Sequence, residues 1–451
     1  MSHWIEKWNP EDEVFWEKEG KFVARRNLFW SILAEHIGFS VWLMWSVTAP
    51  RLPKLGFAYS TEQLFTLVAV PGLVGALMRF PYTFAVPRFG GRNWTIVSAT
   101  LLVGPALLLA IFVQRPDTPF WLMALVAATA GLGGGNFASS MANISFFYPD
   151  KKKGLALGLN AAGGNIGVSS VQLLAPMVIG IGAAASSSRP HLENIGFMWL
   201  PLIAIAVFGA IFFMDNLSSA KSNFADQIAV ARHKQTWIMS ILYIATFGSF
   251  VGYSAAFPLL LKTQFPQITA NLAFLGALIG SIARPFGGYL ADKLGGARVT
   301  FWNFVAMALA TLGVLHFLQE KNFAGFLTMF LALFVTTGLG NGSTFRMIPV
   351  IFRSERMRQA RGRGPEAETE ALRHARRDSA AVLGLSSAIG ALGGYFIPRG
   401  FGASIKATGG PETALSGFLA YYVVSIVLTW WYYRRRHFMT RLAPSLAGAN
   451  A

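Results

Sequence analysis

Residues 276–298 read GALIGSIARPFGGYLADKLGGAR, an apolar run of helical length with one arginine near its middle and a glycine pair near its end. An earlier stretch, residues 72–92, reads GLVGALMRFPYTFAVPRFGGR. In both stretches the glycine pair begins eleven residues after the arginine, and the two arginines, Arg79 and Arg284, lie 205 positions apart. Apolar runs of this length that recur at a fixed offset are typical of membrane proteins built from two related halves.

Other segments repeat at similar offsets. Residues 131–133 match residues 338–340 at an offset of 207, and three glycines at 158, 164 and 167 match those at 384, 390 and 393 at an offset of 226. The added residues of the second half fall in 353–378, a basic and polar stretch that we expect to form an inner loop. The order of the matches predicts a parallel repeat with six helices in each half.

Composition agrees with this membrane interpretation. Of the 451 residues, 53% are hydrophobic and only 13% are charged, and the mean hydropathy is +0.46. We therefore predict an all-α membrane protein with twelve transmembrane helices in two pseudo-symmetric six-helix bundles. There is no cysteine, which excludes disulfides, cysteine-based metal sites and thiol catalysis. The predicted helices cover 28–49, 62–86, 93–113, 119–147, 155–184, 196–214, 237–258, 270–291, 299–318, 324–351, 380–398 and 414–433.

The net charge of +17 would ordinarily suggest nucleic acid. However, 27 of the 38 lysines and arginines fall in the segments that lie on one side of the membrane if the N-terminus is cytoplasmic. This bias follows the positive-inside rule and predicts that both termini are cytoplasmic. We thus expect a lipid bilayer and no nucleic acid as a partner. The predicted organisation is a cytoplasmic or interfacial segment at 1–27, bundles at 28–214 and 237–433, a cytoplasmic linker at 215–236 and a cytoplasmic tail at 434–451.

The N-terminal segment is acidic and aromatic, and it lacks the basic start of a signal peptide. Trp8, Phe15 and Trp16 could anchor it in the membrane interface. A loose polar tail is the alternative interpretation.

Arg79 and Arg284 each lie about ten residues from the inner end of their helices, or ~15 Å at the helical rise. That depth is half of a ~30 Å hydrocarbon core, where a guanidinium costs at least ~2.5–3.5 kcal/mol to insert. No acidic residue lies one turn from either arginine in sequence. The pair predicts an anion-binding site, because the planar guanidinium fork suits oxyanions. Ion pairing with acids on other helices is the alternative.

These motifs resemble those of a known family. Residues 288–298 are similar to the loop motif of the major facilitator superfamily. Residues 135–147 (GNFASSMANISFF), 154–167 (GLALGLNAAGGNIG) and 384–395 (GLSSAIGALGGY) resemble the fourth helix and the two signature segments of its nitrate/nitrite porters of the NarK type. The likeness runs over nearly the whole chain and implies the major facilitator fold. Ala161-Ala162 stands where many members have paired glycines.

The resemblance implies a substrate site for a small planar anion. Arg79 and Arg284 would bind the anion, Asn165 would donate a hydrogen bond to it, and Ser387 would lie beside it. Aromatic side chains would close the cavity around the ion and exclude larger hydrated anions. Taken alone, each of them is better explained as core packing. These aromatics are Phe39, Phe137, Tyr243 and Phe247.

Two further polar positions stand out. Glu35 and His36 lie in the first predicted helix, and a desolvated glutamate or a histidine can titrate during transport. They are candidates for proton coupling, with a structural salt bridge as the alternative. Arg346 in the tenth helix is either a third anion contact or an arginine that extends to the inner surface.

We expect a secondary active transporter that imports nitrate by alternating access, with protons as the coupling ion. A nitrate/nitrite antiporter on the same scaffold is the alternative, and a nitrate sensor that does not transport or an organic phosphate carrier is less favoured. Nitrite is a second candidate substrate. We expect a monomer in the inner membrane of the cell, with no enzymatic activity, no cofactor and no metal site, since neither a Walker motif nor a histidine cluster of metal-binding type is present.

Overall fold

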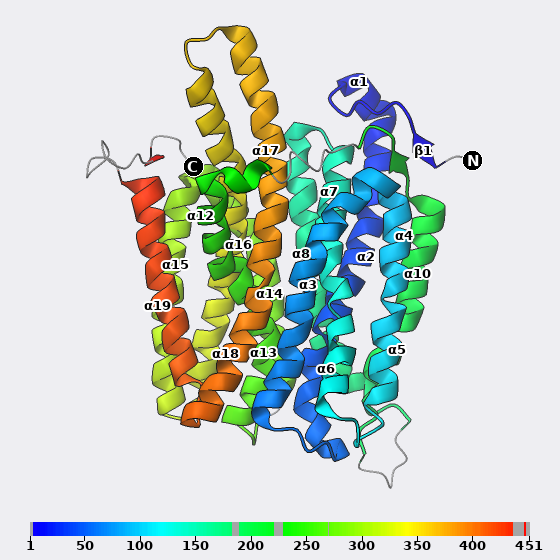
Figure 1. The fold of residues 1–451 in the computed structure, drawn as a ribbon, viewed down its shortest axis with the longest axis vertical. Helices are drawn as coiled ribbons and strands as arrows, with labels where there is room; N and C mark the ends of the chain where they lie inside the picture. The colour runs from blue at the N-terminus through cyan, green and yellow to red at the C-terminus, as the bar shows by residue number, and fades with distance from the viewer. Residues whose placement is uncertain (1–2, 183–188, 221–228, 269, 436–445, 448–451) are drawn as a thin grey trace. The chain divides into compact units, whose positions relative to one another are not determined.

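The structure is a computed structural model, and it describes residues 3–182, 189–220, 229–268, 270–435 and 446–447. It is almost entirely helical (Figure 1). Within the described residues, eleven helices or helix pairs are long and apolar enough to cross a membrane. A further helix, Asp150–Val178, is long enough to cross a membrane but is less apolar than the other eleven. It begins with charged residues and contains several glycines, asparagines and serines. Twelve membrane-crossing helices, as predicted, account for the fold.

The elements of the first sequence half begin with a short N-terminal segment and end before the linker. They are β1 (Trp4–Ile5), α1 (Glu13–Phe15), η1 (Trp16–Gly20), α2 (Lys21–Thr48), η2 (Ala49–Leu55), α3 (Thr61–Phe89), α4 (Gly91–Leu101), α5 (Val103–Phe112), α6 (Phe120–Thr129), α7 (Leu132–Phe147), α8 (Asp150–Val178), α9 (Glu193–Phe197), α10 (Trp199–Phe213) and β2 (Asn216–Leu217).

The second half begins after the linker and is also helical. Its elements are η3 (Val230–Arg232), α12 (Lys234–Tyr243), η4 (Ile244–Gly248), α13 (Ser249–Gln264), η5 (Ala270–Ala273), α14 (Phe274–Leu294), α15 (Gly296–Gln319), α16 (Phe323–Ala360), α17 (Pro365–Ala391), α18 (Gly393–Thr408), α19 (Glu412–Thr429) and η6 (Trp430–Arg434).

Contacts group the chain into two compact units. Unit 1 comprises Met1–Lys221, Val251–Ser281 and Ala391–Ala414, and unit 2 comprises Ser222–Phe250, Ile282–Gly390 and Leu415–Ala451. In unit 1, α2 packs against α7 and α8, and α3 packs against α7 and α18. In unit 2, α15 packs along α16, and η4 contacts α16. Unit 1 combines the first sequence half with two segments of the second half, whereas unit 2 contains only residues that follow position 221. The predicted boundaries of the repeat stay a prediction.

The repeat motif has a counterpart in the backbone. Gly90, with φ of 87°, follows the last residue of α3, and Gly295, with φ of 88°, follows the last residue of α14. This left-handed region is open to glycine and costly for residues with a Cβ atom. Each glycine stops a long helix and lets the next one begin directly, at Gly91 in α4 and at Gly296 in α15. The glycine pairs quoted above therefore mark the same tight connection in each half.

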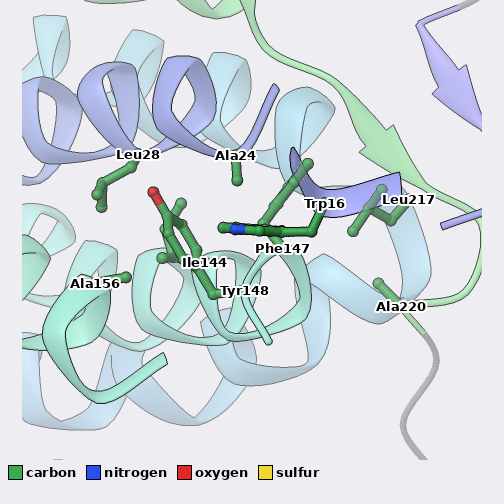
Figure 2. Close-up of a cluster of buried hydrophobic side chains, with 9 residues drawn as sticks. All are labelled: Trp16, Ala24, Leu28, Ile144, Phe147, Tyr148, Ala156, Leu217 and Ala220. Carbon is green, nitrogen blue, oxygen red and sulfur yellow. The ribbon is translucent and has the colours of Figure 1, made fainter. Parts of the chain in front are cut away.

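The N-terminal segment is folded onto unit 1. β1 pairs in parallel with β2, which joins the start of the chain to the start of the linker. Trp16 is only 5% exposed and packs against Tyr148 (Figure 2). Trp8 contacts Phe15 and Phe147. Both tryptophans pack on protein, which differs from the loose polar tail. The interfacial anchor stays a prediction. The two tryptophan rings contact Phe147 and Tyr148, where α7 connects to α8. These partners lie far away in the sequence, so the sequence did not reveal the contacts.

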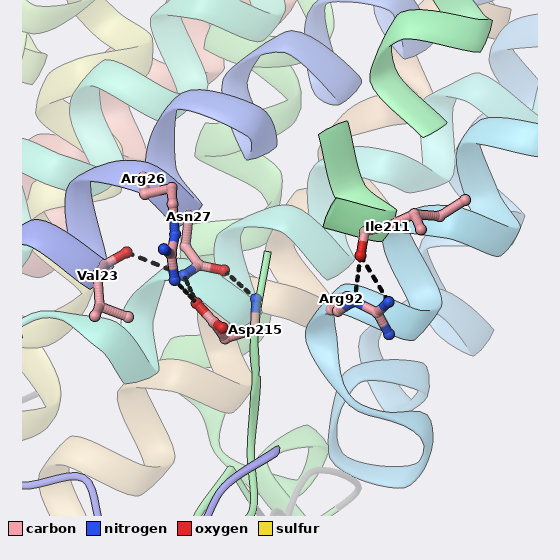
Figure 3. Close-up of polar contacts among 6 residues, drawn as sticks. All are labelled: Val23, Arg26, Asn27, Arg92, Ile211 and Asp215. Atoms are coloured by element: carbon pink, nitrogen blue, oxygen red, sulfur yellow. Dashed lines mark hydrogen bonds and ion pairs between the residues drawn. The ribbon is translucent and has the colours of Figure 1, made fainter. Parts of the chain in front are cut away.

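Side-chain contacts also fix the start of the linker (Figure 3). Arg26 forms an ion pair with Asp215 at 2.7 Å, and Asn27 donates to the same carboxylate at 2.9 Å. Arg92 donates to the carbonyl oxygen of Ile211. The beginning of the linker is therefore bound to the first turns of α2.

Residues 353–378 are not the loop that we expected. α16 continues to Ala360 and α17 begins at Pro365, so the two helices form a hairpin closed by a short turn (Figure 1). Arg356 and Asp378 form an ion pair between them at 2.5 Å. The stretch is polar but rich in alanine, glutamate and arginine, which favour helices, and Gly362 and Gly364 supply the turn with positive φ.

Candidate functional site

Arg79 lies fully buried near the middle of α3 in unit 1. Its Nε donates to the carbonyl oxygen of Gly134 at 3.1 Å. The guanidinium carbon lies 4.6 Å from the ring centroid of Phe137 and 5.6 Å from that of Trp42. Two aromatic faces thus hold the guanidinium by cation–π attraction, which orients it.

The aromatic wall around Arg79 is continuous. Phe39 on α2 lies 6.2 Å from Phe137 on α7, centroid to centroid, and 5.3 Å from Trp42. All three rings are buried. Trp42 donates from its indole nitrogen to the carbonyl oxygen of Pro71 at 2.7 Å, which fixes the ring against α3. An apolar surface of this kind excludes water from the side of a bound ion that faces it.

Two buried amides in unit 1 have unused hydrogen-bonding capacity. Neither amide atom of Asn165 on α8, nor of Asn136 on α7, has a hydrogen-bond partner among the described residues. A buried amide in this condition costs free energy unless water or a ligand satisfies it. Both positions are therefore suited to bind a small polar ligand.

Arg284 occupies the equivalent place in unit 2. It is buried on α14, with its guanidinium carbon 5.6 Å from the ring centroid of Phe345. Phe345 lies 6.1 Å from Tyr243, and Tyr243 stacks on Phe247 at 5.3 Å with an interplanar angle of 21°. A short π-helical turn, η4, begins directly after Tyr243 and contains Phe247. Such turns are frequent at functional sites.

Small residues on α17 permit this stacking. A Cβ atom at Gly390 would come within 2.6 Å of the Tyr243 ring. Ser387 is buried one turn earlier and donates to the carbonyl oxygen of Gly384 at 2.9 Å. The neighbouring Ser386 lies 3.0 Å from the hydroxyl of Ser240. The second signature segment therefore packs directly against the aromatic pair.

Glu35 is at the centre of a buried polar cluster in unit 1. Its Oε2 accepts hydrogen bonds from Ser140 on α7 and, at 2.6 Å, from Asn160 on α8. Ser31 lies 3.0 Å from the Ser140 hydroxyl. A Cβ atom at Gly164 would collide with the Glu35 carboxyl group. Three helices thus enclose one carboxyl group, and the first signature segment supplies both a donor and the space for it.

His36 points elsewhere. Its Nδ1 lies 3.0 Å from the carbonyl oxygen of Gly163. A carbonyl oxygen can only accept, so Nδ1 carries the proton in this arrangement.

The structure brings several predicted residues together and adds others. Phe39 and Phe137 join Arg79, while Tyr243 and Phe247 reach Arg284 through Phe345. Their roles toward an anion stay predictions, as do those of Asn165 and Ser387. Sequence reasoning gave no role to Trp42, Asn136, Ser140, Asn160 and Phe345. Trp42 carried a signal, since it lies one helical turn after Phe39.

Arg346 lies beside an acidic side chain, and its two predicted roles stay predictions. It forms an ion pair with Asp292, at the end of α14, and its side chain is 48% exposed. The pair joins α14 to α16 within unit 2. Among the described residues, no group of three or more histidine, cysteine or acidic side chains could hold a metal ion.

Comparisons with known proteins show which family the sequence of the chain matches. A family model described as Major Facilitator Superfamily matches residues 36–363. The chain is 46% identical over 450 residues to the Nitrate/nitrite transporter NarU of Escherichia coli (strain K12), covering 96% of this chain and 97% of the relative. It is 35% identical to the Probable nitrate/nitrite antiporter NarK2 of Thermus thermophilus, covering 94% and 95%.

Solved structures share the fold at low identity. The crystal structure of a D-xylose-proton symporter matches with a TM-score of 0.65 and 14% identity, covering 90% of this chain and 97% of that chain. A partially occluded inward-open structure of the xylose transporter XylE from E. coli also has a TM-score of 0.65, with 13% identity over 93% and 99%. These likenesses concern the fold alone.

Proposed function

We propose a function from one premise: the chain belongs to the Major Facilitator Superfamily and, within it, to the nitrate/nitrite porters of the NarK type. It is a multi-pass membrane transporter of nitrate and nitrite. The finer proposal is that it imports nitrate by alternating access, as a monomer in the inner membrane with both termini in the cytoplasm, and that protons drive the import.

The observation that carries the proposal is the pair of buried arginines at equivalent repeat positions. Arg79 and Arg284 each lie against aromatic faces in their own unit. A guanidinium matches the planar nitrate ion edge to edge with parallel N–H···O bonds. Aromatic walls favour a small, weakly hydrated anion over phosphate, because a strongly hydrated ion would lose too much solvation.

Alternating access requires contacts that can close one end of the transporter and then separate. At the N-terminal end of α3, Lys406 of α18 forms an ion pair with Glu62 at 2.7 Å, and Arg399 donates to Thr66. Deeper in, Gly72 and Gly394 bring the two helix backbones into direct contact. In this proposal, these charges and the tight glycine contact form the closure that must separate when the transporter opens at this end.

Glu35 is the group we propose to carry the coupled proton. Nitrate import against an inside-negative potential costs ~2.3 kcal/mol per elementary charge per 100 mV, so nitrate cannot accumulate alone. Glu35 is fully buried, and its Oε2 is held by Ser140 and Asn160. A carboxyl group in such a position can accept a proton when transport changes its surroundings. His36, bonded to the backbone, orients the neighbouring helices in this proposal.

Nitrate/nitrite exchange is the second candidate, and the name of the Thermus thermophilus relative favours it. An exchanger needs no titrating group, because its substrate arginines move only when they hold an anion. Both functions predict nitrate movement, but they differ in what drives it.

Uptake of nitrate into proteoliposomes separates them. Liposomes are prepared with an imposed pH gradient, acidic outside, or with internal nitrite and no gradient. The pH gradient alone should drive uptake by the native protein, and Glu35→Gln should abolish this stimulation while nitrate binding persists. Glu320→Gln, which neutralises an exposed glutamate near the end of α15, is the matched control. Stimulation by internal nitrite alone would favour the exchanger and overturn proton symport.

A further inference from the structure

Unit 1 contains a cavity of about 540 Å³ that is separate from the arginine site. It opens where η1 and the start of α2 face the α7–α8 connection and the first turns of α8. It is lined by Trp16, Glu17, Lys21, Arg25, Leu28, Tyr148, Lys152, Leu155, Ala156 and Leu159. The cavity is thus basic and aromatic on one side and aliphatic on the other.

The charged side of the cavity has an excess of positive charge. Lys21, Arg25 and Lys152 face a single acid, Glu17. Glu17 is shared by the two lysines, at 2.7 Å from Lys21 and 3.4 Å from Lys152. In the part of the chain that the structure describes, Arg25 forms no ion pair. Burial raises the pKa of the Tyr148 hydroxyl, and the positive charge of Arg25 opposes this rise. The three cations and one acid leave a net charge of +2, which a bound anion would reduce.

Trp16 adds a donor on the inner wall. Its side chain is more than nine-tenths buried, yet the indole nitrogen has no hydrogen-bond partner among the described residues. Figure 2 shows this nitrogen directed toward the side where Tyr148 and Leu28 lie, and both of these line the cavity. A buried N–H without an acceptor is costly and points to a ligand oxygen.

The aliphatic side identifies the class of ligand. Leu155 and Leu159 lie one turn apart on α8, and they are 72% and 48% exposed. Adjacent to them, α2 changes from charged turns at 21–26 to its apolar run. Such a change from charged to apolar residues is expected where lipid headgroups meet the hydrocarbon core. A free anion would use the cations but not the leucines, whereas a phospholipid would use both.

We propose that this cavity binds an anionic phospholipid. The phosphate would accept from Trp16 and lie among Lys21, Arg25 and Lys152, and the acyl chains would follow Leu155 and Leu159. Basic pockets at the ends of membrane helices are suited to such headgroups. The lipid would then fasten the N-terminal segment to α8, the helix that carries the first signature segment and Asn160. The proposal does not depend on which ion drives transport.

The test uses the purified full-length chain and dioleoylphosphatidylglycerol, with dioleoylphosphatidylcholine as the neutral lipid. Native mass spectrometry counts the lipids retained, and the thermal unfolding midpoint is measured in each lipid. We expect phosphatidylglycerol to be retained preferentially and to raise the midpoint. Arg25→Gln and Lys152→Gln should each weaken its binding about fivefold. The midpoint of each variant in phosphatidylcholine shows whether the variant is folded.

Lys151→Gln is the matched control. Lys151 neighbours Lys152, but it does not line the cavity and its side chain is 89% exposed beside Glu13. This variant should bind phosphatidylglycerol as the native chain does. Equal loss in Lys151→Gln and Lys152→Gln would mean general surface attraction and would overturn the proposal. So would an equal shift produced by glycerol 3-phosphate, which would reveal a site for free anions, or equal retention of the two lipids.

Discussion

Asn160 on α8 donates a hydrogen bond to Oε2 of Glu35 on α2, 2.6 Å away, and both side chains are fully buried. The donor belongs to the first signature segment, and the acceptor is the group proposed to carry the proton. Any movement of α8 relative to α2 therefore changes the surroundings of the carboxyl group. The relationship provides a direct physical link between the signature segment and coupling.

Asn160→Leu should disturb both stability and coupling. The change removes a donor from a buried carboxyl group, which costs about 1–3 kcal/mol. We expect a lower thermal unfolding midpoint and weaker stimulation of nitrate uptake by a pH gradient. An unchanged midpoint together with full stimulation would show that this hydrogen bond has no role. Asn194→Leu, which removes a partly exposed amide at α9, is the control for the substitution itself.

Arg79→Lys and Arg284→Lys should each weaken nitrate binding by at least about tenfold, or ~1.4 kcal/mol. An ammonium keeps the charge but lacks the planar fork. Isothermal calorimetry on the purified protein measures the effect. Arg346→Lys is the matched control, because Arg346 is half exposed and paired with Asp292. If both buried variants bound nitrate as the native chain does, the site assignment would be wrong.

Gly164→Ala and Gly158→Ala test the packing of the first signature segment. Alanine at 164 would collide with Glu35, whereas no atom lies within 4 Å of a Cβ at 158. Gly158→Ala should be neutral or stabilising by about 0.5–1 kcal/mol, because alanine favours the helix. Gly164→Ala should lower the thermal unfolding midpoint and reduce uptake. Equal behaviour of the two variants would contradict the close approach of α8 to Glu35.

Glu62→Gln should loosen the contact between α3 and α18. Ala69 lies on the same face of α3 as Phe65 and Gly72, which contact α18, and it is buried. A cysteine at Ala69, in a chain that has no other, should react faster with an external maleimide when Glu62 is neutralised. Glu320→Gln should leave the labelling rate unchanged. A rate that does not respond to Glu62→Gln would exclude this ion pair from the closure.

Sequence patterns predicted the helices well, because membrane spans leave long apolar runs and the repeat fixes their order. They also located Gly90 and Gly295, whose positive φ only glycine adopts easily. The partners of Glu35 could not be predicted, since Ser140 and Asn160 are 105 and 125 positions away and nothing in their local pattern marks the pairing. The hairpin at 353–378 was not predicted, because its many polar residues were interpreted as a loop although they also favour helices.

The hairpin of α16 and α17 has a practical use. At 49.0 kDa, with most of its mass in helices long and apolar enough to lie inside a detergent micelle, the protein offers little for particle alignment in electron cryomicroscopy. The two helices continue without interruption beyond their apolar parts and are closed only by the turn at 361–364. A rigid soluble domain could be grafted there through continuous helices. The natural architecture thus supplies an attachment point for a fiducial domain.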